Sequence, residues 1–159
     1  MEFRNDSIVR IDKSFLHRNQ YGAAAFDYKN QLYLFGGYGL FTFKNIITKY
    51  NFNSNQWEEL TTNSDITPSA REYSDGIIIN KNLFIFGGLN SNKKTKPSSV
   101  IKDNSIWKLN LETLNWEQLG IINSKYRYTD SRERKQIFQA NNKLYLLSLI
   151  HISEPTRPY

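Results

Sequence analysis

The sequence predicts an all-β protein built from a repeated unit of about fifty residues. A Phe-Gly-Gly sequence occurs twice, ending at Gly37 and at Gly88, and each time it closes an apolar run. A tryptophan follows each glycine pair, Trp57 in the first copy and Trp116 in the second. No window shows the apolar spacing of a long amphipathic helix. A period of roughly 20–50 residues is typical of solenoids, propellers and arrays, in which each unit buries its apolar face against the next.

The two copies differ in one place. The glycine pairs are 51 residues apart and the tryptophans are 59 apart, so the second copy carries eight additional residues between these two landmarks. The difference falls in the polar run 89–104, where an insertion is expected. A third copy begins at Gln136 and breaks off after Leu146, where a glycine pair would follow.

Each complete copy predicts four short strands. They span 22–28, 32–35, 46–52 and 57–60 in the first copy, and 76–80, 83–86, 105–111 and 116–119 in the second. The second strand of each copy is apolar throughout, which is the pattern of a strand buried on both faces. Turns rich in asparagine, such as Lys29-Asn30, separate the strands. We expect Trp57 and Trp116 at equivalent, largely buried positions.

This pattern resembles the kelch family, whose repeat is one four-stranded blade of a β-propeller. The resemblance covers 21–60 and 71–119, with a partial unit at 134–146. The positions that match the family's pattern are the double glycines Gly36-Gly37 and Gly87-Gly88, the tryptophans Trp57 and Trp116, and the apolar positions Tyr50 and Leu109, seven residues before each tryptophan. Adjacent glycines can take positive φ and allow close backbone approach, whereas tryptophan supplies apolar area between blades.

The resemblance implies a partial propeller with two complete blades and the start of a third. Blade 1 is expected over 21–70, blade 2 over 71–124 and the start of blade 3 over 125–146, with 1–20 belonging to a preceding or closing blade. Because closed propellers have about 4–8 blades, we expect the chain to be a fragment of a larger protein.

The last residues match no strand pattern. Residues 147–157 coincide with one translated frame of a widely used transposase-based sequencing adapter. We therefore expect residues 147–159 to be read-through sequence that packs poorly, and we exclude them from the reasoning about the fold.

Composition narrows the possible functions. The chain has no cysteine, which excludes disulfides, thiolate catalysis and cysteine-based zinc sites. The net charge is +6, but the basic residues form two separated loop clusters instead of a continuous stripe, so nucleic acid is not the expected partner. Neither a secretory signal nor an apolar stretch of membrane-spanning length is visible, which slightly favours a cytoplasmic location.

Loop length points to one face as the binding surface. The connections 38–45, 61–70, 89–104 and 120–134 are long and are expected on one face, whereas the tight turns are expected on the other. The candidate binding residues on the long-loop face are Tyr38, Phe41, Arg71, Tyr73, Tyr126, Arg127 and Tyr128. Two alternatives stay open: Phe41 or Phe43 caps the blade core, and Arg71 resembles a structural arginine of the family.

A protein-binding module is the function that this pattern favours, with a protein as the main partner and a carbohydrate as a second. One alternative is a carbohydrate-active propeller enzyme similar to galactose oxidase or to sialic-acid mutarotases, and another is a sensory or scaffold region of a larger protein. The sequence has no Gly-x-Ser-x-Gly, no glycine-rich phosphate loop and no histidine pair for a metal. We therefore identify no catalytic residue, metal ligand or cofactor.

Overall fold

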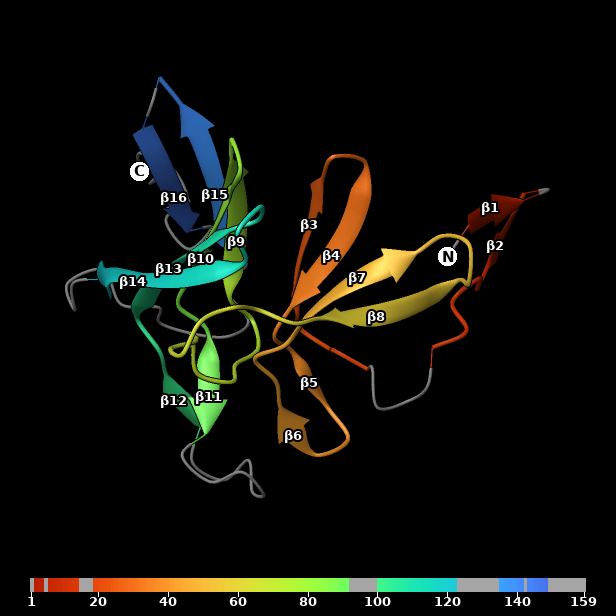
Figure 1. Cartoon of the computed structure of the whole chain (residues 1–159), viewed down its shortest axis with the longest axis horizontal. Coiled ribbons are helices and arrows are strands. Elements are labelled where there is room, and N and C mark those ends of the chain that lie inside the picture. Colours follow the sequence, from red (N-terminus) through yellow and green to blue (C-terminus); the bar gives the residue numbers. More distant parts are fainter. Residues whose placement is uncertain are drawn as a thin grey trace, which may run out of the picture.

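The computed structural model describes residues 2–4, 6–14, 19–91, 100–122, 135–141 and 143–148. Every regular element in these residues is a β-strand, which confirms the all-β prediction. Two four-stranded antiparallel sheets fan out from a common centre, as the blades of an open propeller do (Figure 1). No helix that could cross a membrane occurs in this part of the chain.

The two sheets have the same internal order. Blade 1 consists of β3 (Ala24–Tyr28), β4 (Gln31–Phe35), β7 (Ile47–Asn51) and β8 (Gln56–Leu60), hydrogen-bonded in that order. Blade 2 consists of β9 (Asp75–Ile79), β10 (Asn82–Phe86), β13 (Ser105–Asn110) and β14 (Asn115–Ile121), also in chain order. These strands confirm the four-strand prediction for each copy, with ends shifted by two residues at most.

The connections between the second and third strands contain small hairpins that the sequence did not reveal. In blade 1, β5 (Tyr38–Gly39) pairs with β6 (Thr42–Phe43), and in blade 2, β11 (Leu89–Ser91) pairs with β12 (Val100–Lys102). Both hairpins project from the same side of the molecule (Figure 1). The two connections between the second and third strands therefore share one side, as expected, but they are partly ordered as ribbons instead of open loops.

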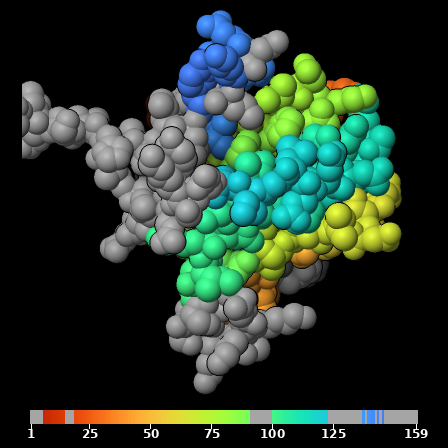
Figure 2. Space-filling view, turned by 90° about the vertical axis from the view of Figure 1, so that its left-hand side faces the viewer, coloured from red at the N-terminus to blue at the C-terminus, as the bar shows by residue number. Residues whose placement is uncertain are grey.

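Two further hairpins flank the blades. At the start of the chain, β1 (Glu2–Arg4) pairs with β2 (Ser7–Val9). Near the end, β15 (Lys135–Ala140) pairs with β16 (Lys143–Ser148), and β15 lies beside β9, the innermost strand of blade 2. This second hairpin is the start of the third blade, and it lies above blade 2 in Figure 2 (blue).

The pairing of β16 extends slightly into the segment that we expected to be read-through. Leu147 pairs with Gln136 and Ser148 with Lys135. Residues 149–159, which make up most of that segment, lie outside the described residues.

The glycine pairs have the role that the sequence predicts for them. Gly37 and Gly88, the second glycine of each pair, have φ of 92° and 114°, in the left-handed half of the Ramachandran plot. A Cβ atom at Gly37 would lie 2.8 Å from the carbonyl carbon of Gln20, and one at Gly88 would lie 2.9 Å from the carbonyl oxygen of Glu72. A side chain would collide with the backbone that leads into the first strand of the blade.

The hydrophobic core lies between the two blades. Blade 1 contributes Ala24, Phe35 and Ile47, and blade 2 contributes Leu83, Ile85, Trp107, Leu109 and Trp116. The rings of Phe35 and Trp116 meet with centroids 5.3 Å apart. Full burial of each large apolar side chain stabilises the fold by roughly 1.5–3 kcal/mol. Two blades are therefore held together mainly by apolar contact across their faces.

The two tryptophans differ in burial. Trp116 is buried, as predicted, because Phe35 of blade 1 covers it. Trp57 has the equivalent position in its sheet, paired with Tyr50 as Trp116 is paired with Leu109, but its burial is intermediate. Its ring contacts Tyr50 of its own blade, at a centroid distance of 5.1 Å. Among the described residues no second blade lies against this side of blade 1.

Candidate functional site

The turn of the β5–β6 hairpin is the most unusual surface feature of the described residues. Gly39 pairs with Thr42, which leaves Leu40 and Phe41 as a two-residue turn. Both have positive φ, 51° and 63°, as a type I′ turn requires. This conformation suits asparagine and glycine and costs leucine or phenylalanine roughly 1 kcal/mol or more each.

The same turn exposes two large apolar side chains. Phe41 is 82% exposed and Leu40 is also exposed. The tight turns on the opposite face also have positive φ, at Lys29, Asn30, Asn80 and Leu114. The β5–β6 turn therefore differs from them less in its backbone than in the exposure of two adjacent large apolar side chains. Strained backbone and exposed apolar side chains together are typical of a recognition site.

A cluster of aromatic side chains lies at the base of this hairpin, and we call Tyr21, Tyr38, Phe43 and Tyr73 the rim cluster. Tyr21 and Tyr38 exchange both backbone hydrogen bonds, at 2.9 and 2.8 Å. Tyr38 packs edge-to-face on Phe43 with centroids 5.1 Å apart, and Tyr21 packs in the same way on Tyr73 at 5.8 Å. The strand ladders that hold the blade together thus also align these four rings.

Tyr21 and Tyr73 are further linked through their hydroxyl groups. A side-chain hydrogen bond with Tyr21, together with burial and the nearby charge of Glu72, raises the pKa of Tyr73 to about 12. Tyr73 therefore stays protonated and keeps its donor at neutral pH. Tyr21 itself is 65% exposed, so one ring of the pair faces solvent. Burial also raises the pKa of the Glu72 carboxyl group.

Glycine at position 22 makes room for the Tyr73 ring. A Cβ atom there would lie 3.2 Å from the ring of Tyr73, and Gly22 has a φ of 65°. The backbone nitrogen of Tyr73 donates a 2.7 Å hydrogen bond to the carbonyl oxygen of Gly22. Tyr73 thus joins the starts of the two blades at the long-loop face.

Arg71 is placed differently from the other candidates. Its side chain is only 1% exposed, and its Nη1 donates to the carbonyl oxygen of Gly87 at 2.9 Å and to Ser105 Oγ at 3.0 Å. Its Nη2 lies 2.8 Å from Asp103 Oδ2 in an ion pair. With its donors bound inside blade 2, Arg71 has the structural role that the sequence left open, and we remove it from the candidate binding residues.

Of the remaining candidates, the structure brings Tyr38 and Tyr73 into the rim cluster and places Phe41 at the hairpin tip. Tyr126, Arg127 and Tyr128 lie outside the described residues. Sequence reasoning missed Tyr21 and Leu40. The repeat offset of 51 residues aligns Tyr21 with Glu72, and each forms a backbone bridge to the residue after its glycine pair. This shared position at the entry of a blade could have drawn attention to Tyr21. Leu40 offered no comparable signal, since its exposure depends on a hairpin that the sequence did not predict.

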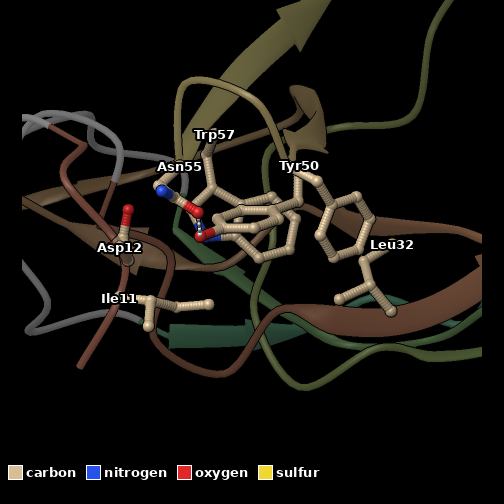
Figure 3. A pocket seen from close by; sticks show the side chains of 7 residues that line it. Ile11, Asp12, Leu32, Tyr50, Asn55 and Trp57 are labelled. Atoms are coloured by element: carbon tan, nitrogen blue, oxygen red, sulfur yellow. Dashed lines mark hydrogen bonds between the residues drawn. The ribbon is translucent and has the colours of Figure 1, made fainter. Parts of the chain in front are cut away.

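A separate pocket lies on the outer face of blade 1 (Figure 3). It is a cavity of about 480 Å³ lined by Ile11, Asp12, Leu32, Tyr50, Phe52, Asn55 and Trp57. The aromatic rings of Tyr50 and Trp57 form its floor, and the Tyr50 hydroxyl bonds Asn55 Oδ1 at 3.3 Å. Its lining is largely apolar, and among the described residues no group of three His, Cys, Asp or Glu side chains could hold a metal ion.

Comparison with known families accounts for the repeated sheets. The KLHDC2/KLHL20/DRC7 Kelch-repeats domain matches residues 7–149, which is most of the chain. The chain belongs to this kelch-repeat family. Kelch domains generally mediate protein interactions.

Individual relatives show the same relationship at lower coverage. The chain is 33% identical over 94 residues to Kelch domain-containing protein 10 of Rattus norvegicus, an alignment that covers 56% of this chain and 21% of the relative. The human protein of the same name gives 33% identity over 94 residues, covering 56% of this chain and 20% of the relative. The Xenopus laevis protein is 31% identical over 97 residues, covering 58% and 22%. The aligned part thus spans about a fifth of these relatives, and none of their names states an enzymatic activity.

Proposed function

We propose that this kelch domain is a protein-interaction module that recognises its partner through the long-loop face, with the β5–β6 hairpin tip as the main contact. The observation that carries this proposal is the pair Leu40 and Phe41, held exposed in a turn of unfavourable backbone conformation. A partner pocket that buries Phe41 would gain roughly 1.5–3 kcal/mol from its side chain alone. Central aromatic anchors of this kind dominate the energetics of many protein interfaces.

The rim cluster supplies the second part of the proposed surface. Tyr21, Tyr38 and Tyr73 offer apolar ring faces together with hydroxyl groups, and tyrosine is enriched in recognition surfaces for this reason. Because backbone ladders and edge-to-face contacts already fix these rings, little side-chain freedom would be lost on binding. The rim cluster is therefore a pre-organised surface next to the exposed Phe41.

A variant that improves the turn tests the proposal. The double substitution Leu40→Asn/Phe41→Gly installs the residues that a type I′ turn prefers, so the free energy of unfolding should rise by about 1 kcal/mol. Peptides selected from a displayed random-peptide library on the unmodified chain should lose binding to this variant by tenfold or more. Urea denaturation and fluorescence anisotropy with a labelled selected peptide measure the two effects.

A matched control uses a turn on the other face. Asn53→Asp changes an exposed residue between β7 and β8 and should leave peptide affinity unchanged. Peptides that bind the double variant as tightly as the original chain, or that lose binding with Asn53→Asp, would place the recognition surface elsewhere.

A further inference from the structure

Glu72 carries a half-buried carboxyl group at the entry of blade 2, on the long-loop face. Among the described residues its carboxylate makes no hydrogen bond and no ion pair. Arg71 precedes it in the chain, but the Arg71 guanidinium lies inside blade 2 and is paired with Asp103. Burial raises the pKa of Glu72, and no opposite charge within the described residues lowers it again. A partly desolvated carboxylate without a partner costs free energy that a bound cation would recover.

The backbone at Tyr73 brings its side chain to the same side of the chain as that of Glu72. Successive side chains of an extended strand point to opposite sides. Glu72 is extended, because it bridges to Leu89 in an antiparallel pair, but Tyr73 has a φ of 52°. Relative to a strand residue this is a rotation of roughly 170° about the N–Cα bond, which cancels the alternation. The hydrogen bond with Tyr21 and burial raise the pKa of Tyr73, and the charge of Glu72 raises it further.

The rings of Tyr21 and Tyr73 form a corner beside this carboxylate. Gly22 is the blade 1 equivalent of Tyr73, and without a side chain it leaves the space that the Tyr73 ring occupies. The two rings are nearly perpendicular, with an angle of 84° between their planes and centroids 5.8 Å apart. Tyr21 is 65% exposed, so solvent reaches this corner. Two neighbouring blades thus bring two aromatic rings and one carboxylate together.

A ring corner and a carboxylate attract the same kind of group. The face of an aromatic ring attracts a cation that lies within about 6 Å of the centroid. A carboxylate accepts charge-assisted hydrogen bonds, and the guanidinium group supplies two of them in parallel. The guanidinium is planar, so it can stack on a ring and donate within its own plane at the same time, whereas an ammonium group is compact and more strongly hydrated. Arginine therefore fits both parts of the site.

We propose that Tyr21, Tyr73 and Glu72 form a subsite for an arginine side chain of the protein partner, and we call these three residues the arginine subsite. The guanidinium lies in the ring corner and donates to the Glu72 carboxylate. This inference rests on the proposed function, because it takes the partner to be a protein that binds the long-loop face. It adds a specificity that the apolar hairpin tip does not supply. Since the chain has a net charge of +6, selection of a basic side chain depends on this local site.

Two small compounds test the subsite without any selected partner. N-acetyl-arginine amide carries the charge, and N-acetyl-citrulline amide has nearly the same shape without it. In ¹H–¹⁵N NMR spectra of the full chain, millimolar arginine amide should shift the backbone amide signals of Gly22, Glu72 and Tyr73. The citrulline compound should shift them less, by about fivefold or more. Equal shifts from the two compounds, or no shift from either, would overturn the inference.

Variants of the protein assign the effect to the subsite. Glu72→Gln should remove most of the shift caused by arginine amide. The matched control Asp27→Asn removes an exposed carboxylate near the tight turns of blade 1 and should leave the shift unchanged. Tyr21→Phe keeps the ring and should retain binding, whereas Tyr21→Leu should weaken it by about threefold or more. A merely structural role of Glu72 or Tyr21 would change Tm without changing the ratio between arginine and citrulline binding.

Peptides selected on the unmodified chain separate this inference from the proposed function. They should contain arginine, and its replacement by citrulline should weaken binding to the unmodified chain by about tenfold but leave binding to Glu72→Gln unchanged. Peptides that lose binding to Leu40→Asn/Phe41→Gly but depend on neither arginine nor Glu72 would overturn the arginine subsite and leave the proposed function standing. Peptides that depend on arginine and Glu72 but bind the hairpin variant as tightly as the unmodified chain would support the subsite and remove the hairpin tip as the main contact.

Discussion

Blade 1 and blade 2 satisfy the same buried backbone carbonyl with different chemistry. In blade 1, Gln20 Nε2 donates to the carbonyl oxygen of Gly36 at 2.8 Å, and the Thr48 hydroxyl donates to Gln20 Oε1 at 2.7 Å. In blade 2, Arg71 donates to the carbonyl oxygen of Gly87, 51 residues further along the chain. Each blade places a buried donor beneath the first glycine of its pair, because a buried carbonyl without a partner is costly.

The difference shows what the repeat requires and what it leaves open. A neutral amide meets the need in blade 1 with one neighbouring hydroxyl. A guanidinium in blade 2 brings a charge into the interior, and this charge needs the Asp103 carboxylate with its surrounding hydroxyl groups. Both blades therefore place a hydrogen-bond donor at this position, and only blade 2 adds an ion pair.

The blades differ in a second respect, the covering of their equivalent apolar faces. Blade 2 has blade 1 against this face, so Leu83 and Trp116 are buried. Blade 1 presents the corresponding Leu32 and Trp57 at a partly open pocket. In blade 2, β14 and its neighbours form the surface that Figure 2 shows (cyan), and the third hairpin lies above them. Burial in each blade thus depends on its neighbour more than on its own sequence.

The largest effect on stability is expected from removing Arg71, the charged donor to the buried carbonyl of blade 2. Arg71→Ala should lower the free energy of unfolding by about 3–5 kcal/mol, because it leaves Asp103 as an uncompensated charge. Gln20→Ala in blade 1 should cost about 1–3 kcal/mol, since only neutral partners are lost. Urea denaturation of both variants measures the difference. The double variant Arg71→Gln/Asp103→Asn, which imitates blade 1, should recover part of the loss, and equal costs for the two single variants would contradict the comparison.

The covering of the apolar faces is tested by a matched pair of leucines. Leu83→Ala should cost about 2–5 kcal/mol, because it opens a cavity in the packed interface. Leu32→Ala should cost about 1 kcal/mol or less in the chain as it stands, because its side chain is half in solvent. The denaturation midpoints of the two variants give both values. A cost for Leu32 as large as that for Leu83 would mean that the outer face of blade 1 is already covered.

The pH dependence should differ between the two buried sites. Burial alone would raise the pKa of Asp103, but hydrogen bonds from Ser105 and Ser69 and the charge of Arg71 outweigh it and hold the pKa below its ordinary value of 3.8. A lowered pKa in the folded state gives a stabilisation that is complete above 3.8 and is lost as the pH falls further. Unfolding free energies measured from neutral pH down to acid should therefore converge for the unmodified chain and Asp103→Asn. Gln20 does not titrate. The Gln20→Ala variant should therefore lose stability with falling pH as steeply as the unmodified chain does.

The smallest effect is expected from Ser14 and Ser64, whose hydroxyl groups accept hydrogen bonds from the backbone nitrogens of Trp57 and Trp116. Ser14→Ala and Ser64→Ala should each lower the free energy of unfolding by about 0.5–1.5 kcal/mol, because each removes the acceptor of one tryptophan backbone nitrogen. Similar values would support the view that Ser14 contributes to blade 1 what Ser64 contributes to blade 2. A neutral Ser14→Ala beside a costly Ser64→Ala would show that the two contacts are not equivalent.

Much of the fold could be predicted because it depends on local patterns. Apolar runs, asparagine turns and the Phe-Gly-Gly sequence indicated the eight blade strands within a few residues. The positive φ at Gly37 and Gly88 follows from what glycine alone tolerates. The β5–β6 hairpin was missed because the turn at Leu40 and Phe41 breaks the rule that type I′ turns use asparagine and glycine. Residue preferences for type I′ turns therefore could not predict a turn formed by leucine and phenylalanine.

The candidate site was only partly predictable. Aromatic and arginine side chains on long connections drew attention to one face, and Tyr38 and Tyr73 do lie in the rim cluster there. The same rule selected Arg71, because a side chain that bonds inward and one that points outward are identical in sequence. Tyr21 was missed because its neighbour Tyr73 is 52 residues away, and only packing brings the two rings together.

By itself, the sequence determined the repeat, its strands and its glycine turns, since period, turn preference and steric tolerance act between near neighbours. Only the tertiary structure decided which of two equivalent residues is buried, whether Arg71 faces a partner or Asp103, and which apolar face stays open. Those outcomes depend on what another blade places against each surface, and the hydrophobic effect acts on the area that neighbours remove from water. A local sequence pattern does not determine how much of a residue's surface a neighbouring blade will cover.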